Sequence, residues 1–249
     1  LAVWEGEGTG SRTTVNVSGH MNIEDAPCSL CGQCITHCPV GALRERDDTE
    51  KVWDALADEK KTVVVQVAPA VRTSWGEQTG LAPEDATIGK IMDALKRMGA
   101  DYAFDTVFSA DLTIMEEANE FVQRFTSGEL KGHPMFTPCC PGWARFIKSQ
   151  YPHLVRYLST AKSPQQMFGA VLKEEARRDK ENKRKTGVVS IMPCTAKKAE
   201  IRRPEHKTDG EQDVDYVLTT TEVTRMIKEA GIDLAQMPSE ALDMPFGLS

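Results

Sequence analysis

Strand-like and helix-like segments alternate along the chain from residue 61 onward. The runs TVVVQVAP (62–69) and GVVSIMP (187–193) are rich in β-branched residues, which is typical of strands buried on both faces of a parallel sheet. Other segments predict a strand at 102–108 and amphipathic helices at 87–100, 110–125, 141–151 and 163–180. This alternation predicts an α/β fold in which a parallel sheet is flanked by helices.

Three cysteines follow segments that predict strands. Cys194 comes directly after the run 187–193, and Cys139 and Cys140 follow HPMFT (133–137), which predicts a short strand. Functional groups gather at the carboxyl ends of strands in such sheets, so we expect these cysteines to converge on one edge. Neighbouring cysteines rarely bridge each other, because such a disulfide falls outside normal bridge geometry. Cys139 and Cys140 are therefore expected to have separate roles.

Four further cysteines form a single run near the N-terminus. Cys28, Cys31, Cys34 and Cys38 are followed by a proline and give the pattern C-x2-C-x2-C-x3-C-P of ferredoxin-type iron–sulfur sites. Gly32 allows the backbone to approach a cluster closely. A disulfide framework and a zinc site are the alternatives, but disulfides are rare in the cytosol and zinc sites usually pair two C-x2-C units at longer separation. The run predicts a 4Fe–4S cluster.

The ligand count of this run is incomplete on its own. In ferredoxin-like domains the first three cysteines hold one cubane and the fourth ligates another, so Cys28, Cys31 and Cys34 need a fourth ligand. A site that uses Cys38 in the same cluster is the alternative. Because the sequence starts with Leu1 and ends in MPFGLS, we expect a fragment truncated at both ends, with an upstream cysteine motif missing.

Charge and hydropathy argue against two classes of partner. The net charge of −7 leaves no basic surface for nucleic acid. No apolar run approaches the ~20 residues that a membrane-spanning helix needs, and the N-terminus lacks the basic start and apolar core of a signal peptide. We therefore expect a cytoplasmic protein that binds neither nucleic acid nor membrane.

Several motifs, in order, resemble the catalytic subunit of FeFe-hydrogenases. They are the cysteine run, TPCCPGW (137–143) and MPCTAKKAE (192–200), with support from VAPAVR (67–72), TIMEEANE (113–120) and LSTAKSPQQ (158–166). The resemblance implies part of a ferredoxin-like 4Fe–4S domain over residues 1–47. It implies the N-terminal portion of the hydrogenase large domain over residues 48–249.

The resemblance implies an H-cluster as the active site. In this cofactor a 4Fe–4S cubane shares a cysteine thiolate with a two-iron centre that carries carbonyl, cyanide and azadithiolate ligands. Cys140 and Cys194 would be two of the cubane ligands, and the other two are expected in a third, glycine-rich motif beyond Ser249. Lys197 would donate a hydrogen bond to a cyanide. The rest of the cofactor pocket would be formed by Pro69, Ala70, Gln165 and Met192.

The resemblance also implies a proton route that starts at Cys139, whose thiol would exchange protons with the two-iron centre. The route would continue through Glu117, Ser159 and Glu120 to Arg124 and solvent. Glu117 and Glu120 are three residues apart on a predicted helix and therefore share one face. Without the resemblance, these carboxylates would be interpreted as a solvated helix face, and Lys197 as a surface residue.

The implied function is the reversible oxidation of dihydrogen and reduction of protons. Electrons would be carried by 4Fe–4S clusters to or from ferredoxin or an NAD(P)-linked flavoprotein subunit, and maturation proteins would supply the two-iron centre. Two alternatives stay open: a hydrogen sensor, and a non-catalytic iron–sulfur assembly relative of the Nar/Narf type, which builds no two-iron centre. Cys139, Glu117, Glu120 and Lys197 favour the hydrogenase, because only its chemistry needs them.

Overall fold

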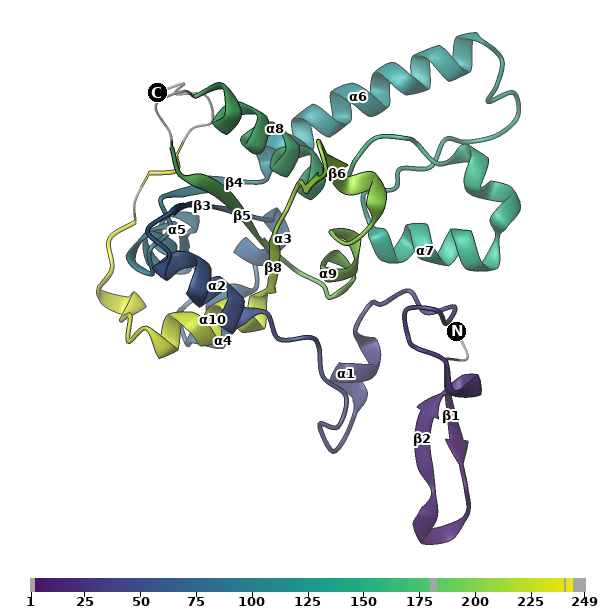
Figure 1. Ribbon diagram of the computed structural model, residues 1–249, viewed down its shortest axis with the longest axis horizontal. Coiled ribbons are helices and arrows are strands. Elements are labelled where there is room, and N and C mark those ends of the chain that lie inside the picture. The colour runs from purple at the N-terminus through teal and green to yellow at the C-terminus, as the bar shows by residue number, and fades with distance from the viewer. Residues whose placement is uncertain (1–2, 180–182, 240, 244–249) are drawn as a thin grey trace.

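The computed structural model describes residues 3–179, 183–239 and 241–243. Its centre is a four-stranded parallel sheet with the strand order β4–β3–β5–β8 (Figure 1). The strands are β3 (Lys61–Val67), β4 (Tyr102–Asp105), β5 (Lys185–Met192) and β8 (Tyr216–Thr219). The prediction of an α/β fold with a parallel sheet is confirmed.

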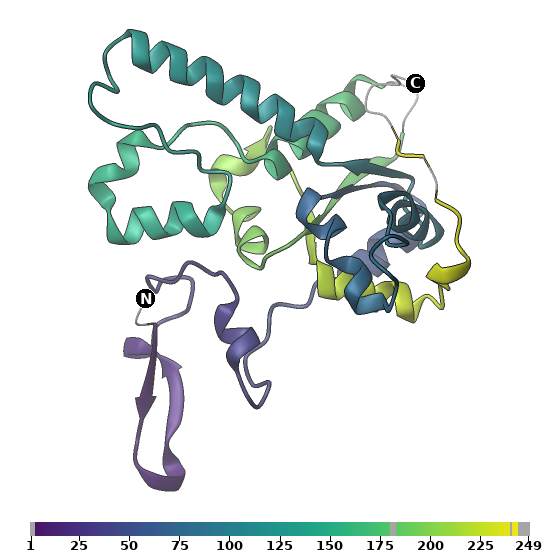
Figure 2. The ribbon, with the colours of Figure 1, turned by 180° about the vertical axis from the view of Figure 1, so that it is seen from behind.

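Helices cover both faces of this sheet (Figures 1 and 2). One face carries α2 (Thr49–Ala57), α5 (Ile88–Arg97) and α10 (Thr220–Glu229). The other face carries α8 (Pro164–Arg178), which packs against the long helix α6 (Val107–Thr126). The remaining helices are short or lie beside the sheet: α1 (Gln33–His37), α3 (Pro69–Arg72), α4 (Trp75–Thr79), α7 (Pro141–Gln150) and α9 (Ala196–Glu200).

The side-chain pattern of β3 explains why both faces are covered. Val63, Val65 and Val67 point to the core that α2, α5 and α10 close, whereas Val64 packs against Phe168 of α8 on the other face. A strand that is apolar on both faces is stable only between two layers of helices. Burial on both sides therefore follows directly from the VVV run of the sequence.

One predicted boundary is wrong by a few residues, and one predicted strand is largely absent. The strand expected over 102–108 ends at Asp105, because the Asp105 carboxylate accepts a hydrogen bond from the backbone N–H of Val107 (2.9 Å) and α6 begins there. The segment expected as a strand at 133–137 forms one isolated parallel bridge, between Phe136 and Leu158, and does not join the sheet. Cys139 and Cys140 therefore do not follow a strand of the sheet.

Helix α2 was not predicted, because the start of TEKVWDALA looks like part of a charged link. Thr49 begins the helix, and the Asp47 carboxylate accepts hydrogen bonds from both its backbone N–H and its hydroxyl. Val52 and Ala55 then face the core. A capping box starts α10, with Thr219 and Glu222 as its two members.

The N-terminal part of the chain forms a small extension beside the sheet domain. An antiparallel hairpin of β1 (Trp4–Glu7) and β2 (Thr14–Val17) projects from the body, and α1 lies between it and the sheet domain (Figures 1 and 2). A second, two-residue hairpin pairs β6 (Lys207–Thr208) with β7 (Glu211–Gln212). No helix among the described residues is both long and apolar enough to cross a membrane.

Candidate functional site

The carboxyl ends of β3 and β5 lie side by side and bring several predicted site residues together. Val67 of β3 is paired with Ile191 of β5, so the chain leaves both strands at the same edge. Pro69 and Ala70 open α3 directly after β3, and Met192 is the buried last residue of β5. Cys194 follows two residues later. This edge therefore brings together the predicted site residues that follow β3 and those at the end of β5.

The loop of Cys139 and Cys140 reaches the same edge from outside the sheet. Cys140 is the N-cap residue of α7, and Pro141 occupies the first helical position. The first turn of α7 packs against the start of α9: a Cβ placed on Gly142 would lie 3.9 Å from the Cβ of Ala196 and 3.8 Å from the sulfur of Cys140. The predicted convergence of cysteines is thus reached through α7 rather than through a third strand.

Cys194 and Cys140 lie close enough to influence each other. Burial raises the pKa of the Cys194 thiol above its usual value, and the nearby Cys140 adds to this effect. The backbone N–H groups of Lys197 and Ala196 oppose it by pointing toward the Cys194 sulfur. These N–H groups are suited to stabilising a metal-bound thiolate, whose sulfur carries negative charge.

Lys197 connects the two cysteine segments through its buried ammonium group. Its Nζ donates to the backbone oxygen of Cys139 (2.9 Å) and to Oε2 of Glu200 (3.0 Å). The same Glu200 oxygen accepts from Nε2 of Gln165 (3.0 Å), while Oε1 of Gln165 is buried without a hydrogen-bond partner among the described residues. A lysine ammonium has three N–H donors, so one remains for a ligand.

Glu200 was missed as a site residue by the sequence analysis, although it stands in the quoted motif. It is almost fully buried and holds both Lys197 and Gln165, which come from α9 and α8. A signal was present, because residues three apart on a helix face each other and Lys197 and Glu200 have opposite charges.

Three of the predicted proton-route residues form a connected group. The hydroxyl of Ser159 donates to Oε2 of Glu120 (2.6 Å), and Arg124 donates to Oε1 of Glu120 (3.3 Å) and to the backbone oxygen of Leu158 (3.1 Å). The backbone N–H of Thr160 also donates to Glu120 (2.9 Å). These contacts tie the end of α6 to the segment that follows α7.

Glu117 lies one turn before Glu120 on α6 and is set apart from this group. Its Oε1 is buried with no hydrogen-bond partner in the described part of the chain. Burial raises the pKa of Glu117, and the charge of Glu120 raises it further. A carboxyl group with a raised pKa holds its proton more readily than an exposed one, which suits a group that passes protons. Among the described residues, no hydrogen bond joins Glu117 to Cys139 or to Ser159.

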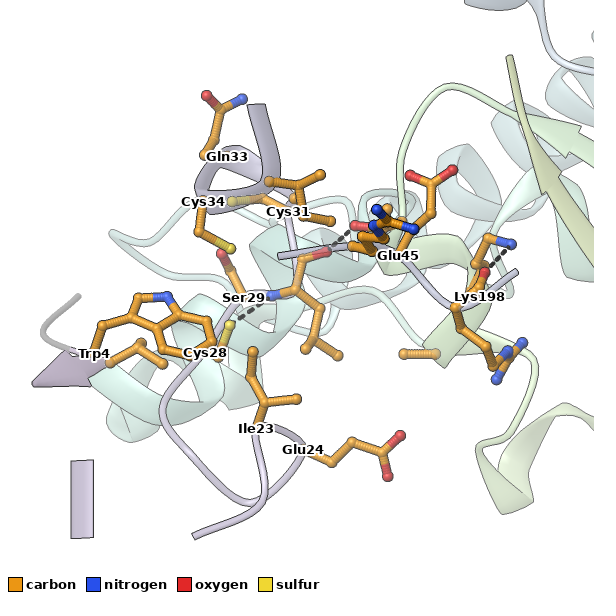
Figure 3. Close-up of a pocket in the computed structure, with 18 of the residues that line it drawn as sticks. Trp4, Ile23, Glu24, Cys28, Ser29, Cys31, Gln33, Cys34, Glu45 and Lys198 are labelled. Carbon is orange, nitrogen blue, oxygen red and sulfur yellow. Dashed lines mark hydrogen bonds between the residues drawn. The ribbon is translucent and has the colours of Figure 1, made fainter. Parts of the chain in front are cut away.

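Part of the N-terminal cysteine run lines an open cavity of about 600 Å³ (Figure 3). Cys28, Cys31 and Cys34 line it, whereas Cys38 is not among its lining residues. Positive φ angles at Leu30 (57°) and Gly32 (79°) turn the loop between these cysteines. This arrangement agrees with three cysteines serving one cluster and the fourth serving another.

Backbone N–H groups lie close to the sulfurs of three cysteines of this run. The N–H of Leu30 donates to the sulfur of Cys28 (3.3 Å), and the N–H of Gln33 lowers the pKa of Cys31. The N–H groups of Leu43 and Val40 lower the pKa of Cys38. Cysteine sulfurs with backbone N–H donors fit ligands of iron–sulfur clusters.

The seven cysteines are free thiols in the described part of the chain.

Comparison with known proteins identifies the family of the chain. The sequence model of the family described as "Iron only hydrogenase large subunit, C-terminal domain" matches residues 61–249. The apo [FeFe]-hydrogenase HydA1 from Chlamydomonas reinhardtii superimposes with a TM-score of 0.74 and is 40% identical, over 82% of this chain and 53% of that chain.

Curated relatives include hydrogenases and an assembly protein. The chain is 46% identical, over 99% of its length, to the NADP-reducing hydrogenase subunit HndD of Solidesulfovibrio fructosivorans. It is 44% identical over 92% to the periplasmic [Fe] hydrogenase large subunit of Nitratidesulfovibrio vulgaris, and 34% identical over 95% to the cytosolic iron-sulfur assembly component 3 of Bos taurus. It spans 43%, 62% and 53% of these relatives, respectively.

Proposed function

Because the chain belongs to the family of the iron-only hydrogenase large subunit, C-terminal domain, we propose that it serves the reversible oxidation of dihydrogen and reduction of protons. The observation that carries this proposal is the buried ammonium of Lys197, which bonds to the backbone of Cys139 and to Glu200. A buried cation between two cysteine segments fits a site for anionic ligands.

The residues at this site fit an H-cluster. Cys140 and Cys194 would ligate its cubane, and the two further thiolate ligands would come from outside residues 1–249. When bound, the two-iron centre would supply the metal chemistry of making and splitting dihydrogen. Lys197 would hold an anionic ligand with its remaining N–H donor. Gln165 donates to the same Glu200 oxygen as Lys197, and its carboxamide oxygen has no hydrogen-bond partner among the described residues. Met192, Pro69 and Ala70 would complete the wall at the ends of β3 and β5.

Protons would reach the site along residues of α6 and the segment after α7. The Cys139 thiol would exchange a proton with the reacting centre, and Glu117 would carry it next, which its raised pKa supports. Ser159, Glu120 and Arg124 are already joined by hydrogen bonds and would pass the proton onward.

Electrons would enter through the N-terminal cysteine run. Cys28, Cys31 and Cys34 would hold a 4Fe–4S cluster of a ferredoxin-like domain over residues 1–47, and Cys38 would serve a second cluster. Ferredoxin or an NAD(P)-linked flavoprotein subunit would supply the electrons, and the NADP-reducing relative supports the second of these partners. Maturation proteins would insert the two-iron centre.

The cytoplasm stays our proposed compartment, although one relative is named as a periplasmic enzyme.

An assembly function is the second candidate, because a cytosolic iron-sulfur assembly component is also similar. Two observations favour the hydrogenase. Identity to the two hydrogenases is 46% and 44%, against 34% for the assembly protein. In addition, Cys139, Glu117 and Lys197 are needed only for chemistry at a two-iron centre.

Substitution of the adjacent cysteines tests the proposal in the intact, matured enzyme. Cys139→Ala should leave the iron site assembled and lower turnover in both directions by at least ~10²–10⁴-fold, the usual contribution of a proton relay. Cys140→Ala should instead prevent assembly, because it removes a cubane ligand. Cys139→Asp should keep part of the activity. Hydrogen evolution and the infrared bands of bound carbonyl and cyanide report the two effects separately. Near wild-type turnover of Cys139→Ala with intact bands would contradict the relay.

A further inference from the structure

Arg145 fastens the N-terminal cysteine loop to the helix that begins after Cys140. Its Nε donates to the backbone oxygen of Cys28 (2.8 Å), and its Nη2 donates to those of Glu24 (2.9 Å) and Ala26 (3.5 Å). The planar guanidinium presents its donors in a fixed fork, so three carbonyls bound to it are held in one arrangement. Arg145 lies in the second turn of α7.

Thr195 makes a second contact, from the residue directly after Cys194. Its hydroxyl donates to the backbone oxygen of Leu30 (2.7 Å). A Cβ placed on Gly32 would lie 3.0 Å from the same hydroxyl oxygen, so the loop rests directly on Thr195. The left-handed backbone at Leu30 and Gly32 makes this close approach possible.

The loop also touches the first turn of α7. A Cβ on Gly142 would lie 3.2 Å from the backbone oxygen of Ser29 and 3.8 Å from the sulfur of Cys140. The segment 28–32 therefore contacts the immediate neighbours of both Cys140 and Cys194. Outside this segment, Arg145 also binds the backbone oxygens of Glu24 and Ala26. In the hydrogen bonds of the described chain, Arg145 and Thr195 bind no further residue of 3–47.

We infer that Arg145 and Thr195 are positioning residues that hold the Cys28–Cys34 loop against the segments of Cys140 and Cys194, and thereby set the distance for electron transfer between the two iron–sulfur sites. The inference rests on the proposed function. Cys28, Cys31 and Cys34 would hold the cluster that gives up one electron in this step, and Cys140 and Cys194 would be ligands of the cubane that accepts it. No bond or proton changes at the contact. Electron tunnelling slows steeply with distance, so a loosened loop slows this step.

Arg202 provides a matched control, because it also contacts the N-terminal segment, at Glu24. Its guanidinium pairs with the side chain of Glu24 (2.7 Å), but the two side chains are 47% and 60% exposed. Exposed pairs of this kind contribute little to stability or position. Arg202→Ala therefore removes an arginine from the same neighbourhood without releasing the backbone of the loop.

The experiment compares Arg145→Ala, Arg145→Lys and Thr195→Val with Arg202→Ala in the intact, cluster-loaded protein of matched iron content. Amide hydrogen exchange over residues 24–34 should become at least tenfold faster in Arg145→Ala, because the substitution removes three charge-assisted hydrogen bonds and the loss of one already accounts for about that factor. Arg145→Lys should restore little of this protection, because an ammonium cannot present the same fork. Thr195→Val, which removes only one hydroxyl, should give a smaller increase.

Stopped-flow reduction then measures electron transfer itself. With a protein electron donor, reduction of the cubane held by Cys140 and Cys194 should slow at least tenfold in Arg145→Ala and should slow less in Thr195→Val. It should also slow far less in Arg202→Ala, which removes a charge that lines the same cavity but leaves the backbone of the loop held. Faster exchange with unchanged electron transfer would overturn the inference, as would equal effects of Arg145→Ala and Arg202→Ala. Because the electron step is read from cluster signals, it is measured even if the wild-type protein produces no dihydrogen, an outcome that would instead contradict the proposed function.

Discussion

Replacing Lys198 with methionine removes the cation from a buried group of charges. The Nζ of Lys198 donates to Oε1 of Glu222 (2.7 Å), to Oδ2 of Asp48 (3.2 Å) and to the backbone oxygen of Arg46 (2.8 Å). The three charged side chains are only 3–5% exposed. The group joins the segment before α2 to α9 and α10.

The expected loss of stability is electrostatic, because methionine has nearly the same shape as the lysine stem. Breaking a buried ion pair by removing one partner costs ~3–5 kcal/mol. Asp48 keeps its hydrogen bonds from Arg46, and Glu222 keeps the backbone N–H groups of Thr219 and Asp48. We therefore expect the lower end of that range, about 3 kcal/mol.

Urea unfolding of the intact protein at neutral pH measures this loss. Arg178→Met is the control, because Arg178 pairs with Glu174 on an exposed helix surface, with side chains 71% and 47% exposed, and should lose no more than about 0.5 kcal/mol. Adding Glu222→Gln to Lys198→Met should recover part of the loss by removing an uncompensated carboxylate. A loss below about 1 kcal/mol for Lys198→Met would refute the reasoning.

The same variant should change the acid sensitivity of the protein. Burial alone would raise the pKa of Asp48, but hydrogen bonds from Arg46 and the charge of Lys198 hold it below its usual value. A lowered carboxyl pKa stabilises the fold above the unfolded-state pKa, and this contribution is lost as the pH falls through the folded-state pKa. Without Lys198, that loss should begin at a higher pH.

Two further predictions concern packing and the proton route. Gly169→Ala should destabilise the protein by ~1–3 kcal/mol in thermal unfolding, because its Cβ would lie 2.3 Å from the backbone oxygen of Asp213; an unchanged midpoint would contradict the packing of α8 against the segment before β8. At pH values above the raised pKa of Glu117, where the folded carboxylate is disfavoured, Glu117→Gln should raise the midpoint temperature of thermal unfolding. At pH values well below 4.5, the midpoint temperature should stay unchanged. A stabilisation that is independent of pH would show that burial of the charge is not its cause.

The sheet could be predicted from the sequence because its strands carry their own signal. β3 and β5 are apolar on both faces, and this pattern has few interpretations other than a strand between two layers. Thr219 and Glu222 mark the start of α10 by local chemistry alone. By contrast, the start of α2 depends on the hydrogen bonds that Asp47 accepts from Thr49. In the sequence, this segment looks like a charged link.

The site could be predicted only as a set of residue types. The motifs contain Cys140, Cys194 and Lys197, but the partners that fix them come from distant parts of the chain. Gln165 meets Glu200 across 35 residues, and Arg145 meets Cys28 across 117. Such contacts depend on how α7, α8 and α9 pack, and no local pattern encodes that.

The most direct test of the account is hydrogen production by the intact protein after maturation with the two-iron centre. With a reduced electron donor, gas chromatography should detect dihydrogen, and the infrared spectrum should contain bands of iron-bound carbonyl and cyanide that disappear in Cys140→Ala. A protein that holds stable cubanes by iron analysis and EPR, yet shows neither these bands nor dihydrogen, would contradict the account and identify an assembly protein instead.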